Sequence, residues 1–254
     1  MTTVAVLSLK GGVGKTTCVL GLAGAAWARN MSVLVIDADP QANASAALDL
    51  PPHLFTLGDV LADARPGIAK DAVVPSGWGP RLHAIPSEEA LAHRNQPEGP
   101  DSATRLRVSL TGLTDRYDLV LIDCPPSLDE LTRNALAAAD GALVVTEPGF
   151  FALQGATRAL AAIDAARDSL NLRLRPVGIC VNRLRTQLSE HRYRLQELHE
   201  AFPALIIDPP IPERSAVQQA QGASVPIQAW PSPGAREAVE AFDDVLDRIL
   251  RSPN

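Results

Sequence analysis

The segment Lys10-Gly11-Gly12-Val13-Gly14-Lys15-Thr16-Thr17 decides the fold of this chain. It follows the largely apolar run 4–9 and precedes a helix-like stretch that extends to about residue 29. A strand, a glycine-rich turn and a helix start in this order predict a phosphate-binding loop, because the N–H groups of the turn and the positive end of the helix dipole attract an anion. Eight matching positions disfavour the alternative, a tight turn that is rich in glycine by chance.

The loop gives each of its residues a chemical task. The glycines let the backbone surround phosphate groups, Lys15 supplies a point charge, and the Thr16 hydroxyl is suited to ligate magnesium. The predicted cofactor-binding residues of the loop are Gly11, Gly12, Val13, Gly14, Lys15, Thr16 and Thr17. The sequence thus predicts a nucleotide phosphate site near the start of the chain.

A second lysine makes the loop unusual. Leu9 occupies the place of the first glycine in the G-x-x-x-x-G-K-[ST] pattern, and Lys10 follows it. Lys15 already fills the phosphate-contacting place, so Lys10, on the opposite lip, is expected to point outward. The 23 basic residues comprise 20 arginines and three lysines, of which Lys70 is the third. Lysine therefore occurs mainly where a compact ammonium is wanted.

The K-G-G-x-G-K-[ST]-T loop resembles the deviant Walker A motif of the ParA/MinD ATPases. The resemblance implies a P-loop α/β fold with a mostly parallel central sheet flanked by helices on both faces, and ATP and Mg2+ as cofactors. It also implies catalytic roles for Lys10 and Lys15. In this family the first lysine reaches across a homodimer to the partner's ATP, and by resemblance Lys10 takes that role.

Composition fits one α/β domain over residues 1–254, since 46% of the residues are hydrophobic. Three cysteines without paired spacing indicate reduced thiols of a cytoplasmic protein rather than disulfides or a metal cluster. No signal-like start and no apolar run of about 20 residues is present, so no membrane partner is expected. Because the chain starts at its first strand, we expect no preceding DNA-reading extension. The net charge of −6 leaves room for a local basic patch.

Two carboxylates follow the second predicted strand, residues 32–36. Asp37-Ala38-Asp39-Pro40-Gln41 lies where open α/β sheets bind ligands. Taken alone, this stretch fits a solvated turn with an aspartate helix cap better, but the neighbouring P-loop favours a functional role. The D-x-D-P-Q-x-N pattern resembles the ParA-type switch I segment. The resemblance implies that Asp37 helps to hold magnesium through water and that Asp39 is a catalytic residue that positions or activates the attacking water.

A third motif spans residues 118–126. The apolar run 119–122 predicts a central strand, and Asp123 at its end is the predicted Walker B ligand of magnesium. The following segment, 125–140, resembles the D-x-P-P-S-L…L-T-x-N-A-L-x-A-A-D signature of ParA proteins more than that of MinD. The resemblance implies a switch II loop and a helix that reports nucleotide state to the dimer interface.

Other elements are expected from local patterns. Within the proline- and glycine-punctuated region 48–112, we expect a helix at 57–61, a strand at 81–85 and a helix at 104–113. A strand at 141–146 precedes a helix whose apolar positions are 153, 160, 163 and 170. Glu147 lies between this strand and this helix, at a position where relatives usually carry an uncharged residue. Nothing in the sequence accounts for its charge.

The strand 176–181 ends in Asn182. An asparagine there is suited to contact the adenine edge, as in related ATPases, and a cap of the following helix is the alternative. Ile211 and Pro212 are predicted to form the other wall of the base pocket.

Arginines concentrate in residues 173–194, where six of them face one acid, Glu190, for a local charge of +5. Such a segment in an acidic chain predicts a DNA phosphate footprint, while a solvated helix face remains the alternative. The resemblance implies non-specific binding of double-stranded DNA through this half of the chain. The candidate DNA-binding residues are Arg173, Arg175, Arg183, Arg185, Arg192, Arg194 and Arg214.

The last predicted helix has one apolar stripe, residues 239, 242, 246 and 249, and an acidic opposite face. Anionic lipid would repel it, unlike the basic terminal helix of MinD, so we expect it to pack on the core. The resemblance as a whole implies a ParA-type partition ATPase on the nucleoid, with a ParB-type partner that stimulates hydrolysis. The alternatives are an ATPase that positions a protein cargo and a metabolic ligase such as dethiobiotin synthetase, against which the D-P-Q and P-P-S-L motifs count.

Overall fold

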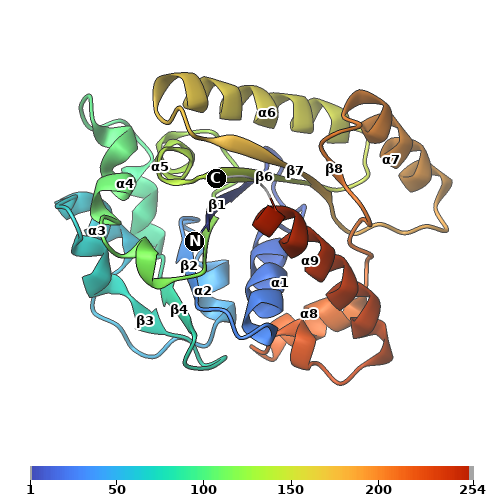
Figure 1. Ribbon diagram of the computed structural model, residues 1–254, viewed down its shortest axis with the longest axis horizontal. Coiled ribbons are helices and arrows are strands. Elements are labelled where there is room, and N and C mark those ends of the chain that lie inside the picture. The colour runs from blue at the N-terminus through green and yellow to red at the C-terminus, as the bar shows by residue number, and fades with distance from the viewer. Residues whose placement is uncertain (1, 252–254) are drawn as a thin grey trace.

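A computed structural model describes residues 2–251, in which a central eight-stranded sheet runs through the molecule (Figure 1). The spatial order of the strands is β3-β4-β2-β5-β1-β6-β7-β8, and within this sheet only β3 pairs antiparallel, to β4. The strands are β1 Thr2–Leu7, β2 Val33–Asp37, β3 Val74–Pro75, β4 Leu82–Ile85, β5 Leu119–Asp123, β6 Gly141–Thr146, β7 Arg175–Val181 and β8 Ile206–Ile207. The predicted mostly parallel sheet is confirmed.

The central strands are apolar because both of their faces are covered. Every residue of β2, β5 and β6 is buried. The parallel register pairs Asp37 with Asp123 as the last residues of β2 and β5. The sequence pattern therefore brings two carboxylates side by side at the carboxyl edge of the sheet.

Helices form a layer on each face of the sheet. Figure 1 shows α1, α8 and α9 on one side and α5 and α6 on the other, each layer with its own apolar core. The α-helices are α1 Lys15–Ala28, α2 Asn43–Ala47, α3 Leu57–Asp63, α4 Arg105–Ser109, α5 Glu130–Ala138, α6 Ala152–Ser169, α7 Ser189–Ala201, α8 Ser215–Gly222 and α9 Pro233–Arg251. Short 3₁₀ helices lie at Ile68–Ala72, Glu89–Arg94, Ser102–Thr104, Thr114–Arg116 and Ile227–Ala229. None of the helices in residues 2–251 is both long and apolar enough to cross a membrane.

The acidic helix α9 packs on the core, as predicted. Phe242 is fully buried against α1, where a Cβ atom on Gly21 would lie 2.4 Å from its ring. On the outer side Arg29, the C-cap residue of α1, forms ion pairs with Asp243 and Asp247. The acidic face of α9 therefore stabilises its contact with α1.

Two local predictions need correction. The predicted helix 104–113 is shorter, because α4 ends at Ser109 and a 3₁₀ turn, Ser102–Thr104, precedes it. Of the four apolar positions predicted for the helix after β6, Ile163 is buried, Leu160 and Leu170 are partly buried, and Leu153 is exposed. The face of α6 that packs on the sheet is mainly alanine, and these small side chains let the helix approach closely: Ala152, Ala156, Ala159, Ile163 and Ala166.

The first turn of α3 offers a stability test. Thr56 Oγ1 accepts from Gly58 N at 3.1 Å and donates to Glu88 Oε1 at 2.6 Å, and Asp59 Oδ2 accepts from Thr56 N at 2.9 Å. We expect Thr56→Ala to lower the free energy of unfolding by about 1–2 kcal/mol, because it removes the cap and leaves Glu88 without its donor. Thermal denaturation measures the loss. Thr157→Ala, which removes an exposed hydroxyl within α6, is the control, and an equal change in both variants would contradict the capping argument.

Candidate nucleotide-binding site

The P-loop connects β1 to α1, and its geometry requires glycine. Gly12 and Gly14 have φ angles of 82° and 88°, in the left-handed region. A Cβ atom on Gly14 would also lie 2.2 Å from Asn182 Nδ2. Lys15 begins α1 and is only 6% exposed, so its ammonium group is placed inside the molecule rather than in bulk water.

A cleft of about 730 Å³ opens above this loop. Most of its wall comes from the P-loop and from segments that follow β2, β5 and β7, and α8 closes one side. The wall includes Gly11, Gly12, Gly14, Lys15, Thr16, Thr17, Asp39, Pro126, Arg183 and Gln221. The cleft has the volume of an ordinary small-molecule site, and its floor is the anion-binding loop.

The two strand-end carboxylates beneath the cleft are buried. Thr16 Oγ1 donates to Asp123 Oδ2 at 2.7 Å, and Asp123 Oδ1 finds no hydrogen-bond partner among residues 2–251. Burial, together with the charge of Asp37, raises the pKa of Asp123 to about 8, and burial raises the pKa of Asp37 to about 6. An unpartnered buried oxygen beside a hydroxyl fits a hard divalent cation.

Asp37 also has a structural task that its motif did not predict. Its Oδ2 accepts from Ser45 N at 2.8 Å and from Ser45 Oγ at 2.7 Å, and its Oδ1 accepts from Asp39 N at 3.2 Å. These contacts fix the switch I segment and α2 to the sheet. The described residues contain no cluster of three or more His, Cys, Asp or Glu side chains that could hold a metal ion by themselves.

Asp39 lies in the wall of the cleft. It is buried, its Oδ1 accepts from Gln41 N at 3.0 Å, and its main-chain oxygen accepts from Ser87 Oγ at 2.7 Å. The segment is thereby held at both its side chain and its backbone. A carboxylate fixed beside a phosphate site is suited to orient a water molecule.

Lys10 lies outside the cleft, in agreement with the predicted outward direction. Its side chain is 54% exposed, and its Nζ forms an ion pair with Glu147 Oε1 at the end of β6. The two lysines of the loop thus occupy different environments. Glu147, which the sequence left without a role, is the partner of the loop's first lysine.

The predicted adenine residues line one small hollow. Asn182, Ile211 and Pro212 form part of the wall of a space of about 20 Å³, enough for one water molecule. Asn182 Nδ2 donates to the carbonyl of Val13 at 2.8 Å and so stabilises the P-loop. The helix-cap alternative for Asn182 is wrong, since α7 begins at Ser189 with Leu188 as its N-cap. The adenine contact stays a prediction.

Gln221 is a site residue that the sequence did not reveal. It lines the cleft, and its Oε1 accepts from Thr17 Oγ1 at 3.3 Å. The two residues are 204 positions apart, so no local pattern could pair them.

The arginine-rich segment does not form a single surface, which corrects its interpretation as one +5 patch. Arg173 and Arg175 lie at the start of β7 and Arg183 follows its end, and the strand between spans about 20 Å. Some charges are also compensated by ion pairs of arginine with glutamate: Arg185 with Glu213, Arg194 with Glu190 and Glu197, and Arg214 with Glu237.

Arg183 belongs to the cleft by its position. It has a left-handed φ of 58°, and its Nη1 donates to the carbonyl of Gly12 at 2.6 Å. Arg192, on the first turn of α7, is exposed and bonds the carbonyl of Thr186. DNA contact by any of these arginines stays a prediction.

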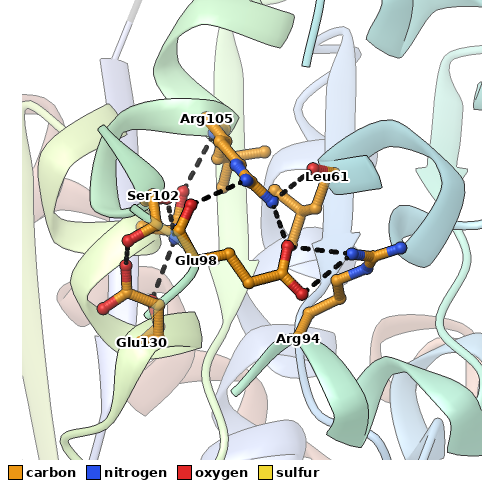
Figure 2. A network of polar contacts seen from close by, with 8 residues as sticks. Leu61, Arg94, Glu98, Ser102, Arg105 and Glu130 are labelled. Atoms are coloured by element: carbon orange, nitrogen blue, oxygen red, sulfur yellow. Dashed lines mark hydrogen bonds and ion pairs between the residues drawn. The ribbon is translucent and has the colours of Figure 1, made fainter. Parts of the chain in front are cut away.

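The helix after switch II is anchored to a region that the sequence left largely unassigned. Figure 2 shows Glu98 between Arg94 and Arg105, and Ser102 beside Glu130, the first residue of α5. Arg105 also donates to the carbonyl of Leu61 at 3.4 Å. Segment 94–105 therefore ties α5 to α3.

Fold and site together define a P-loop nucleotide-binding protein. Residues 1–176 match the AAA domain family. The chromosome partitioning protein ParA of Caulobacter vibrioides is 36% identical over 229 residues, which cover 88% of this chain and 85% of that protein. The chromosome-partitioning ATPase Soj of Thermus thermophilus is 32% identical over 251 residues, with coverage of 97% and 96%. The chain therefore belongs to the ParA family of P-loop ATPases.

Solved structures share the fold. One, named cobyrinic acid a,c-diamide synthase from Mycobacterium smegmatis and containing ADP and magnesium, has a TM-score of 0.77 at 27% identity, covering 88% of this chain and 93% of that one. Apo McdA from Cyanothece has a TM-score of 0.82 at 24% identity, with coverage of 97% and 99%.

The buried Asp123 predicts a pH effect on the metal-free protein. Because its folded-state pKa of about 8 lies above the usual value near 4, stability is lost as pH rises between these values. Asp123→Asn cannot ionise, so its thermal midpoint with a chelator present should exceed that of the wild type by several degrees at about pH 8.5 and by little at about pH 5. Asp115→Asn, at an exposed carboxylate, is the control. A pH-independent difference would contradict the argument.

Proposed function

We propose that this chain is a partition ATPase that binds Mg-ATP in the cleft, dimerises on it and then binds double-stranded DNA without sequence preference on the nucleoid. The observation that carries the proposal is the different placement of the two P-loop lysines. Lys15 is buried in the chain's own cleft, whereas Lys10 is exposed outside it. A cation on the outer lip is available to the nucleotide of a second subunit, in support of a homodimer.

Within one subunit the residues divide the work of hydrolysis. The P-loop N–H groups and Lys15 bind the phosphates, and Asp39 holds the attacking water in line with the phosphorus. Magnesium, when bound, would be held by Thr16 and Asp123, with Asp37 contributing through water, and it would neutralise phosphate charge. Lys10 of the partner would add positive charge where negative charge develops. No covalent intermediate is required.

Release from DNA follows hydrolysis in this proposal, and a ParB-type partner stimulates that step. The support is the similarity to proteins named for chromosome partitioning. Segment 94–105 and α5 form a route by which a partner at the surface can act on switch II.

DNA binding is tested with a duplex of arbitrary sequence, in ADP and in ATP, at two salt concentrations. We expect binding in ATP but not in ADP. The logarithm of the binding constant should fall with the logarithm of the salt concentration, with a slope of about 0.9 per phosphate contacted. Arg192→Ala should weaken binding and reduce that slope, because Arg192 is exposed and its guanidinium donates to a carbonyl, that of Thr186, which leaves its charge available to phosphate. Arg236→Ala, at an exposed arginine of α9, is the matched control. Absence of binding in every nucleotide would refute the DNA step.

A second candidate is an ATP-dependent amide-forming enzyme, favoured by the similarity to the Mycobacterium smegmatis structure that carries a synthase name. Such an enzyme needs a small-molecule acceptor, so it would turn over ATP slowly without one and would not respond to DNA. ATPase activity that DNA stimulates in the absence of any acceptor supports the partition ATPase instead.

A further inference from the structure

The ion pair between Lys10 and Glu147 joins two segments that lie 137 residues apart. Glu147 is the one acid within ion-pair distance of Lys10 in the part of the chain that the structure describes. Together they border a small hollow beside Gly149 and Phe151, whose lining shares no residue with the wall of the cleft. Lys10 is therefore not merely exposed but held in a defined place.

The backbone that carries Glu147 is fixed. Its main-chain oxygen accepts from Gly149 N at 2.8 Å, and Gly149 O accepts from Ala152 N at 2.9 Å. Downstream, the Arg194 guanidinium of α7 lies 5.1 Å from the centre of the Phe150 ring. Glu147 is itself only 28% exposed. Of the two partners, the flexible lysine is the one that can move.

We propose that Glu147 is a positioning residue that holds Lys10 within its own subunit and so opposes formation of the ATP-bound dimer. This inference rests on the proposed function, in which Lys10 reaches the partner's nucleotide. An ammonium bound to a carboxylate must exchange that partner for a phosphate before it acts across the interface. The Glu147 carboxylate left behind then repels the incoming phosphates, so both effects raise the concentration needed for dimerisation.

The size of the effect follows from the exposure of the pair. Partly exposed ion pairs are weak, so Glu147 acts as a reversible restraint rather than a permanent block. A symmetric dimer breaks two such pairs. Removing both should lower the concentration for half-dimerisation by about three- to twentyfold.

The test is sedimentation velocity with Mg2+ and a non-hydrolysable ATP analogue. Glu147→Gln keeps the shape of the side chain and removes its charge, and it should dimerise at the lower concentration. Glu240→Gln, which removes an equal charge from an exposed ion pair of α9, should match the wild type. Lys10→Ala should lose dimerisation, and Lys10→Ala combined with Glu147→Gln should behave like Lys10→Ala alone.

The outcomes separate this inference from the function on which it rests. If the wild type dimerises and Glu147→Gln dimerises equally well or more weakly, the role of Glu147 is overturned and the proposed function stands. A gain from Glu147→Gln that persists without Lys10 also overturns it, because the charge would then act independently of the lysine. If both the wild type and Glu147→Gln remain monomeric, the proposed ATP-bound dimer and the restraint by Glu147 are both refuted.

A measurement on the monomer checks the ion pair directly. With ADP, acylation of Lys10 by an amine-reactive reagent, read by mass spectrometry, should be faster in Glu147→Gln than in the wild type. The exposed Lys70 is an internal reference whose labelling should not change. Equal labelling of Lys10 in both proteins would show that Glu147 does not hold it in solution and would overturn the inference.

Discussion

Lys15→Ala is expected to abolish ATP binding, with a loss of affinity of at least about 100-fold. Lys15, the first residue of α1, is only 6% exposed and lines the floor of the cleft. Charge-assisted hydrogen bonds to phosphate are each worth about 1.5–3 kcal/mol, and a buried lysine with three donors can make more than one. Isothermal titration calorimetry with Mg-ATP measures the loss.

Two further variants make this result specific. Lys70→Ala removes the same charge from an exposed position and should leave the affinity unchanged. Lys15→Arg keeps the charge but places a planar fork where the P-loop surrounds a compact group, so it should also bind poorly. Each variant must keep the wild-type thermal midpoint without nucleotide. Near-normal affinity in Lys15→Ala would refute the assignment of the loop.

The parts of the site that could be predicted are those that depend only on residues close together in the sequence. A buried strand, a glycine turn and a helix start in direct succession place the P-loop without knowledge of distant contacts. The position of Asp123 could be predicted equally well, because an apolar strand that ends in one carboxylate places that carboxylate at the carboxyl edge of a parallel sheet. Both depend on short-range pattern and on a general property of the fold.

Residues 48–112 were predicted less well for a physical reason. Their conformation is stabilised by contacts to distant segments, such as Ser76 Oγ to the carbonyl of Leu48 at 2.7 Å and Trp78 Nε1 to the carbonyl of Ser224 at 2.9 Å. Short 3₁₀ helices make up part of this region. Such turns have no hydrophobic period long enough to recognise in the sequence.

Charge was the property that the sequence described least accurately. Six arginines close together in the chain suggested one surface, yet β7 separates the first two from the rest. Arg185 pairs with Glu213 of a later segment, and Arg194 pairs with two acids of its own helix. Glu147 shows the reverse case, since its partner Lys10 precedes it by 137 residues. Ion pairing depends on distance in space, which a count along the chain does not give.

Asp39→Ala is expected to slow ATP hydrolysis by at least about 100-fold while ATP binding is retained, so that an ATP-bound dimer accumulates. The carboxylate lies in the wall of the cleft, but Lys15, Thr16 and the P-loop N–H groups that bind the phosphates are untouched. The variant should therefore bind DNA for longer than the wild type. Single-turnover phosphate release measures the chemistry, and size-exclusion chromatography with ATP detects the dimer.

Asp39→Asn distinguishes chemistry from loop order. Its amide oxygen can still accept from Gln41 N, the contact that fixes the segment at 3.0 Å, but it carries no charge to orient or activate water. If Asp39 acts on the water, Asp39→Asn should be as slow as Asp39→Ala; if it only orders switch I, Asp39→Asn should hydrolyse ATP normally. Asp71→Ala, at an exposed acid of the Ile68–Ala72 turn, controls for loss of charge. Wild-type rates in both Asp39 variants would exclude the residue from catalysis, and the search for the group that orients water would move to Gln41, which also lines the cleft.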